Sequence, residues 1–196
     1  MHNFYRMTYS GINLGDYSQK VSECARRMHL SPPPLLEDLL CVPVSKVCDI
    51  AKRFSMLKNI IQIGIGGSTL ASQVFKSAIT SKDRRAFFLD VPDARLVDEV
   101  LAQTNLKETL VYVVSKSGNT LETLVILSSL LPYIENPRKN VLVCTGGGEL
   151  RKWAKETRVS VISFPASVPG RFSAYTPAGL LLPEFLSPGA ADIITS

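Results

Sequence analysis

The chain has 196 residues, of which 45% are hydrophobic and 20% charged, so it can bury a full core, and disorder is excluded. No run of 18 or more apolar residues occurs, which excludes a membrane span, and the start, MHNFYRMTYSG, lacks the apolar middle of a secretory signal. We therefore expect a cytoplasmic protein.

The net charge is +5, which suits an anionic partner. No Lys/Arg run with interleaved aromatic residues is present, so we expect neither nucleic acid nor a membrane as a partner, and small anions such as phosphorylated metabolites explain the charge equally well. The cysteines Cys24, Cys41, Cys48 and Cys144 fit neither a zinc site nor a CxxC pair. We expect no metal and no organic cofactor.

The first 58 residues predict a helical N-terminal segment. It contains three helix-like stretches, at 17–30, 35–40 and 45–57. A Ser-Pro-Pro-Pro break separates the first two, and Ser45 is the expected N-cap of the third.

From residue 59 to residue 196 the pattern changes to short β-rich runs separated by helical patterns. The five predicted strands are 59–65, 85–90, 109–115, 140–145 and 159–164. Their near-continuous apolar character indicates that both faces of the sheet are covered. The sequence therefore predicts a doubly wound five-stranded parallel sheet of the α/β class, preceded by the helical segment.

Two strand-to-helix junctions carry the residues of chemical interest, because ligands of open parallel sheets bind beyond the carboxyl ends of the strands. The first, at 64–69, is glycine-rich and lets the backbone approach a ligand, while Ser68 or Thr69 can cap the next helix. The second, at 115–120, gathers hydroxyl groups at the start of a helix, whose N-H groups and dipole favour an anion. Helix capping alone explains either junction about equally well.

The sequence also contains part of a dinucleotide-binding pattern. Gly64-x-Gly66 with Asp90 at the end of the next strand suits a dinucleotide site, but Thr69 stands where that fingerprint needs its third glycine. The glycines at 146–148 are interpreted as a loop without a function. The two histidines, His2 and His29, lie in the helical segment and do not support a nucleophile pair.

Three segments, IGIGGS, VVSKSGNTLET and PGRFSAYTPAGLLLP, resemble the first sugar isomerase (SIS) domain of the phosphoglucose isomerase family. The enzymes of this family interconvert glucose 6-phosphate and fructose 6-phosphate. The similarity runs from about residue 59 to residue 183, and its third segment is the most specific to the family.

The resemblance implies a phosphate-binding site and a hexose 6-phosphate as the partner. It implies that Ser115, Lys116, Ser117 and Thr120 bind the phosphate of a hexose 6-phosphate. Asn119 departs from the family, which commonly has threonine there.

The resemblance also implies residues next to the sugar. Gly67 and Ser68 would lie beside it, and Arg171 would be the catalytic arginine that stabilises the cis-enediolate intermediate. Gly170 would keep the backbone close, although Pro169 stands where the family usually has glycine.

The base and the ring-opening residues of the family lie in a second SIS domain and in C-terminal helices, and no matching motif occurs in this chain. Whether the chain alone is an enzyme therefore stays open. One hypothesis is half of an isomerase site, completed by a second SIS domain or another copy of the chain. The alternative is a stand-alone, non-catalytic phosphosugar-binding or regulatory module, with a nicotinamide oxidoreductase third.

Overall fold

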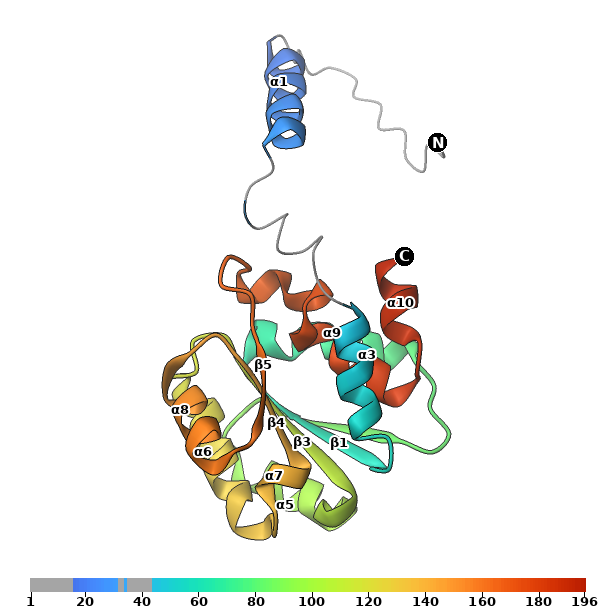
Figure 1. Cartoon of the computed structure of the whole chain (residues 1–196), viewed down its shortest axis with the longest axis vertical. Helices are drawn as coiled ribbons and strands as arrows, with labels where there is room; N and C mark the ends of the chain where they lie inside the picture. Colours follow the sequence, from blue (N-terminus) through green and yellow to red (C-terminus); the bar gives the residue numbers. More distant parts are fainter. Residues whose placement is uncertain (1–15, 32–33, 35–43) are drawn as a thin grey trace. The chain divides into compact units, whose positions relative to one another are not determined.

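A computed structural model of the chain describes residues 16–31, 34 and 44–196 (Figure 1). Its contacts divide it into two units, Met1–Glu37 and Asp38–Ser196, each of which is described by itself. The predicted helix at 35–40 lies outside the described residues, as does Cys41.

The first unit contains α1 (Tyr17–Leu30), at the residues that the sequence predicts. Every residue of this helix is exposed, and an ion pair of 3.1 Å joins Arg27 to Glu23 one turn earlier. Such i,i+4 pairs add only a few tenths of a kcal/mol to an isolated helix. Helix α1 therefore buries none of its residues within the described part of its own unit.

The second unit is built on a parallel sheet. Its strands are β1 (Asn59–Ile63), β2 (Arg85–Leu89), β3 (Thr109–Ser115), β4 (Val141–Thr145) and β5 (Ser160–Ser163). They pair in the order β2-β1-β3-β4-β5, and each neighbouring pair is parallel. The predicted α/β fold is thus confirmed.

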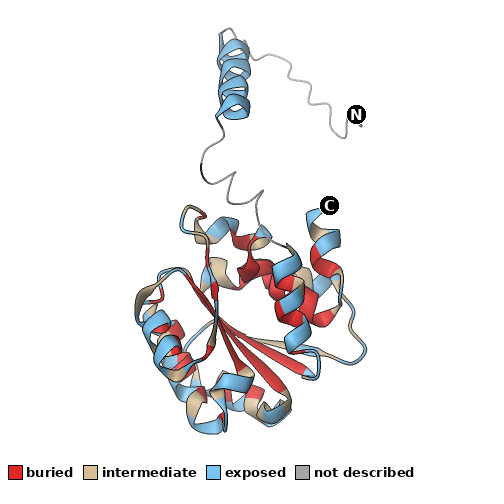
Figure 2. Cartoon of the chain, in the orientation of Figure 1, coloured by how far each residue is buried: buried red, intermediate tan, exposed pale blue. Residues whose placement is uncertain are grey.

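One face of the sheet is covered by three helices, α5 (Ala94–Gln103), α6 (Leu121–Leu130) and α8 (Gly148–Thr157). Alternate strand residues such as Ile61 and Val111 form one buried cluster with Ile126 and Leu150 of these helices. Figure 2 shows the buried strands between the helical layers. Burial on both faces explains the unbroken apolar runs of β1, β3 and β4, whereas the edge strands β2 and β5 are partly exposed.

The other face is organised around α9 (Pro177–Leu186), in which every residue is buried. Around it pack α3 (Val44–Arg53), α4 (Leu70–Ala78) and α10 (Ala190–Thr195). Tyr112 of β3 points to this side and donates a 2.8 Å hydrogen bond to the carbonyl of Pro177. Because α3 packs on α9, it lies in the same unit as the sheet.

Short elements connect these layers: η1 (Gly66–Ser68), η2 (Leu106–Glu108), η3 (Leu131–Tyr133), α7 (Pro137–Asn140) and η4 (Gly170–Tyr175). The expected N-cap at Ser45 is wrong, because α3 already includes Val44. Within the described ranges, none of the helices has the length and apolar character needed to cross a membrane.

A buried carboxylate joins α9 to α10. Glu184 is 5% exposed, and its two oxygens accept hydrogen bonds of 3.0 Å from the N-H groups of Gly189 and Ala191 at the start of α10. Burial and the nearby Glu184 carboxylate also raise the pKa of the Cys48 thiol on α3. Glu184 therefore caps a helix inside the α3, α9 and α10 layer.

Replacing this carboxylate tests its contribution to stability. We expect Glu184→Ala to lower the free energy of unfolding by about 2–3 kcal/mol, because it leaves buried N-H groups without an acceptor. Urea denaturation measures the change. Glu99→Ala, at an exposed position on α5, is the matched control and should change the value by less than about 0.5 kcal/mol. Equal values for the two variants would contradict the capping role.

Candidate functional site

The strand order places the candidate site at the carboxyl ends of β1 and β3. The chain leaves β1 toward β2 on one side of the sheet and leaves β3 toward β4 on the other. Ligands of open α/β sheets bind at such a reversal of strand order. The segments that follow these two strands are η1 and the loop of residues 116–120, which are the two junctions singled out in the sequence.

The loop after β3 is held by the side chain of Ser115, the last residue of the strand. This residue is 2% exposed. Its Oγ lies 3.0 Å from Oγ1 of Thr120 and accepts a 3.1 Å hydrogen bond from the N-H of Gly118. Gly118 has a φ of +71°, which other residues rarely adopt, so the sharp turn depends on glycine here. The two hydroxyls predicted for phosphate binding therefore lie side by side.

Thr120 occupies the N-cap position of α6 but makes no side-chain capping bond. Capping by Thr120 thus does not explain the hydroxyl cluster, and the N-H groups of the first turn receive no bond from this residue. The N-terminus of α6 keeps its capacity to attract an anion.

The two remaining residues of the predicted phosphate site lie in the same loop. Ser117 is exposed, and its Oγ accepts a 3.2 Å hydrogen bond from the N-H of Asn119. Lys116 is half-buried and forms no ion pair with any residue in the described ranges. The structure thus brings together all four predicted phosphate-binding residues at one strand end.

A close backbone contact brings Arg171 to the same edge. A Cβ atom on Gly67 would lie 2.5 Å from the carbonyl carbon and oxygen of Gly170 and 2.9 Å from the nitrogen of Arg171, so only glycine fits at this position of η1. The Oγ of Ser173 donates a 2.6 Å hydrogen bond to the carbonyl of Gly67. Segments about 100 residues apart in the chain are joined by this contact.

A hydrogen bond from β1 holds the backbone of Ser68, the other residue predicted beside the sugar. Gln62 of β1 is fully buried, and its Nε2 donates a 2.8 Å hydrogen bond to the carbonyl of Ser68. The sequence analysis missed both Gln62 and Ser173. Gln62 could have been found because it is a polar residue inside an apolar strand. No local feature of the sequence indicated the partner of Ser173.

Arg171 is exposed at the start of η4, with its guanidinium carbon 5.5 Å from the centre of the Phe172 ring. It makes no ion pair within the part of the chain that the structure describes, so the ordinary role of a surface arginine, pairing with a carboxylate, is not observed. Gly170 has open space around its Cβ position, so the glycine that the close approach requires is Gly67.

Other residues considered in the sequence have structural partners. Asp90, after β2, accepts a 2.9 Å hydrogen bond from Gln73 of α4. Burial raises the pKa of the Cys144 thiol to about 12, which keeps it protonated and unreactive near neutral pH. Among the described residues, no three His, Cys, Asp or Glu side chains gather closely enough to hold a metal ion.

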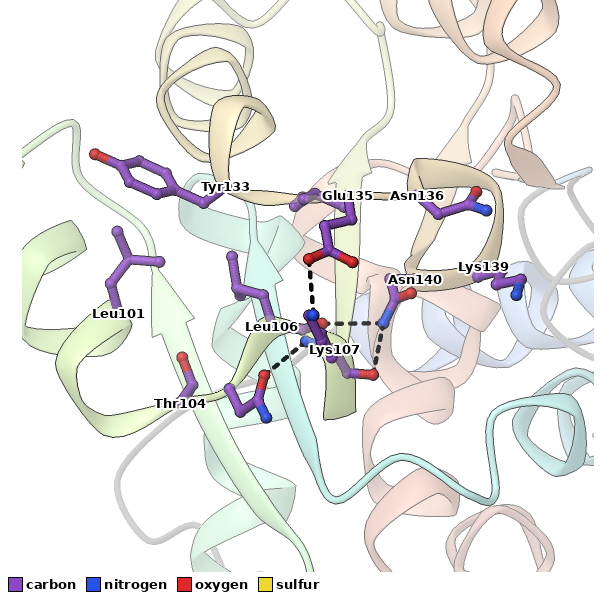
Figure 3. Close-up of a pocket in the computed structure, with 11 residues that line it drawn as sticks. Leu101, Thr104, Leu106, Lys107, Tyr133, Glu135, Asn136, Lys139 and Asn140 are labelled. Atoms are coloured by element: carbon purple, nitrogen blue, oxygen red, sulfur yellow. Dashed lines mark hydrogen bonds and ion pairs between the residues drawn. The ribbon is translucent and has the colours of Figure 1, made fainter.

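A pocket of about 850 Å³ lies at the opposite end of the sheet, between the end of α5 and the turns that precede β3 and β4 (Figure 3). Lys107 and Glu135 form a 2.8 Å ion pair across it, and Nδ2 of Asn140 donates to the carbonyls of Leu106 and Thr109. These polar groups hold the turns to one another. We therefore interpret the pocket as part of the packing between these turns.

The sheet order, the hydroxyl-rich loop and the docked η4 segment define an α/β domain of the sugar isomerase (SIS) type. A hypothetical protein of Thermus thermophilus has the same fold, with a TM-score of 0.81 and 28% identity over 93% of this chain and 47% of that one. A glucose-6-phosphate isomerase from Chlamydia trachomatis superposes with a TM-score of 0.63 and 28% identity, over 73% of this chain and 29% of that one.

The chain belongs to the phosphoglucose isomerase family, whose model matches residues 49–190. A curated relative, the glucose-6-phosphate isomerase of Methanocaldococcus jannaschii, is 34% identical over 135 residues. The match covers 67% of this chain and 34% of that enzyme. The chain thus spans about a third of the length of this relative. The activity of the whole enzyme is therefore only proposed for this chain.

The contact at Gly67 gives a prediction about stability. We expect Gly67→Ala to destabilise the protein by about 1–3 kcal/mol, because the added methyl group meets rigid backbone. Gly170→Ala, which places the same group in open space, should change the unfolding free energy little. Urea denaturation of both variants checks the comparison, and a Gly67→Ala variant as stable as Gly170→Ala would contradict the close docking of η4 on η1.

Proposed function

We propose that this chain binds a hexose 6-phosphate and contributes the phosphate-binding part of a glucose-6-phosphate isomerase site. The observation that carries the proposal is the hydroxyl pair of Ser115 and Thr120 beside the N-terminus of α6, which Thr120 does not cap. Membership in the phosphoglucose isomerase family supports the same substrate class.

Binding of the phosphate group follows from the chemistry of this loop. A phosphate dianion accepts hydrogen bonds through three oxygens and gains from the positive end of a helix dipole. Ser115 and Thr120 offer hydroxyl donors, Ser117 adds a third at the exposed rim, and Lys116 supplies a positive charge. An unphosphorylated sugar has no group that uses this arrangement.

Arg171 would act at the other end of the substrate. In the isomerisation a base removes the proton from C2 of the open-chain aldose, negative charge develops on the enediolate oxygens, and the proton is returned to C1. A guanidinium group without a carboxylate partner can donate two hydrogen bonds to such oxygens, which lowers the barrier through charge stabilisation. The docking of η4 on η1 holds the backbone of Arg171 beside Gly67 and Ser68.

The proton transfer also requires a base and a ring-opening group. Residues 44–196 contain no histidine. Glu184, a carboxylate near the third motif, is buried and already binds the N-H groups that begin α10. We propose that these groups come from a further SIS domain or from another copy of the chain, which together with this domain completes the site.

Exposed apolar side chains surround the proposed site and support this partner. Leu70 and Leu121 are the first residues of α4 and α6 and are 61% and 70% exposed, and Phe172 and Tyr175 of η4 are about half exposed. Apolar side chains gathered around one edge are typical of a surface that another domain covers. A stand-alone phosphosugar-binding module remains the second candidate, favoured by the lack of histidine in residues 44–196.

Ligand titration tests the phosphate site. We expect the chain to bind glucose 6-phosphate and to bind glucose far more weakly, because the loop recognises the dianion. Ser115→Ala and Thr120→Val should each weaken the binding of glucose 6-phosphate by about 1–3 kcal/mol through loss of a charge-assisted hydrogen bond. Isothermal titration calorimetry measures both effects.

Ser128→Ala is the matched control for these variants. Ser128 lies exposed near the far end of α6, and its Oγ donates to a carbonyl of its own helix. Its replacement should leave the affinity unchanged. Equal affinity for glucose and glucose 6-phosphate would overturn the phosphate site.

An activity assay tests the half-site. We expect the chain alone to isomerise fructose 6-phosphate at close to the background rate, because loss of a general base alone costs about 10²- to 10⁴-fold. Turnover should appear when the region of a full-length relative that this chain does not cover is added. A coupled assay follows the product, and Arg171→Ala should abolish the restored activity. Rapid turnover by the chain alone would contradict the proposal of an incomplete site.

A further inference from the structure

The three glycines at 146–148, to which the sequence analysis gave no function, lie against the proposed phosphate loop. A Cβ atom on Gly118 would collide with the carbonyl oxygen of Gly147, and one on Gly148 would collide with the carbonyl oxygen of Ser117. The two loops thus touch through their backbones at positions where only glycine fits. The loop after β4 therefore supports the loop after β3 along its backbone.

Three hydrogen bonds tie the loops together. The N-H of Gly146 donates to the carbonyl of Lys116 at 2.9 Å, and the N-H of Leu150 donates to the carbonyl of Gly118 at 3.0 Å. The third runs from the N-H of Glu149 to Oδ1 of Asn119 and is 2.8 Å long. It is the one bond of the three that depends on a side chain.

Asn119 thereby takes the place of a missing helix cap. The N-cap residue of α8 is Gly147, which has no side chain, and Asn119 supplies the capping oxygen from 30 residues away in the chain. The amides of Glu149 and Leu150 are used by residues of the phosphate loop. The N-terminus of α8 therefore serves to hold that loop, whereas the N-terminus of α6 faces the proposed ligand.

We propose that Asn119 is a positioning residue for phosphate binding: it fixes the 116–120 loop in its binding conformation by joining it to the first turn of α8. The inference rests on the proposed function of that loop. Its physical basis is that a loop already held in the bound geometry loses less conformational freedom on binding. The departure from threonine at position 119 then has a structural reason.

Two variants separate positioning from simple helix capping. Asn119→Ala removes the bond to Glu149 and lowers both stability and affinity under either explanation. Adding Gly147→Ser places a hydroxyl at the N-cap position of α8, where the Cβ position has open space around it. The double variant thus offers α8 a local capping oxygen without the link between the loops.

For the double variant we expect stability close to that of the original chain, measured by urea denaturation. The dissociation constant for glucose 6-phosphate should stay about five- to tenfold higher, the equivalent of one neutral hydrogen bond. Asn136→Ala, at an exposed asparagine before α7 that makes no capping bond, is the matched control and should change neither quantity. Recovery of both stability and affinity in the double variant would reduce Asn119 to a helix cap and overturn the inference.

A measurement without ligand completes the test. We expect the amides of Gly118 and Gly146 to exchange with solvent faster in the double variant than in the original chain, as followed by NMR on ¹⁵N-labelled protein. Unchanged exchange with weakened affinity would mean that Asn119 contacts the ligand itself, which also overturns the inference. If the original chain binds neither glucose 6-phosphate nor inorganic phosphate, the proposed function fails, and this outcome is distinct from both others.

Discussion

The contact between Gly67 and the backbone of Gly170 and Arg171 is the constraint on which the candidate site depends. It requires a residue without a side chain in η1, and it is fixed by the hydrogen bond from Ser173. The sheet alone would bring η1 and the proposed phosphate loop together, because β1 and β3 are neighbours. Only the docking of η4 adds a guanidinium group to that edge. The proposed phosphate loop and Arg171 are thus positioned by separate interactions.

The regular part of the fold could be predicted from the sequence. Apolar runs at 59–65 and 109–115 and helical spacing between them were sufficient, because burial on both faces of a parallel sheet leaves no other pattern. The boundary near residue 58 was predicted from the change of pattern at that point alone. The sequence of α3 is that of an ordinary amphipathic helix. The helix on which it packs, α9, follows more than 100 residues later.

The candidate site was predictable only in its local motifs. Hydroxyl groups at a strand end are visible in the sequence, whereas the bond from Gln62 to the carbonyl of Ser68 and the bond from the N-H of Glu149 to Asn119 are products of folding. The wrong N-cap prediction at Ser45 shows that a local motif can also mislead. A residue of a capping type is compatible with several helix starts. Roles of individual residues toward a substrate rest on the family resemblance, and this chain covers about a third of the length of the relative.

The complete burial of α9 has a consequence for how the candidate site unfolds. All of its residues are buried, and Thr176, its N-cap, binds both the N-H of Ala178 and the carbonyl of Ser173 in η4. Segments without exposed surface open only when the whole domain opens, whereas surface loops open at a small cost in free energy. The short stretch that carries Arg171 is thereby anchored to a fully buried helix of the core. Heat or denaturant should therefore remove the arginine from the edge of the sheet in the same cooperative transition that unfolds the core, and a chain that has kept its core has kept its arginine in place.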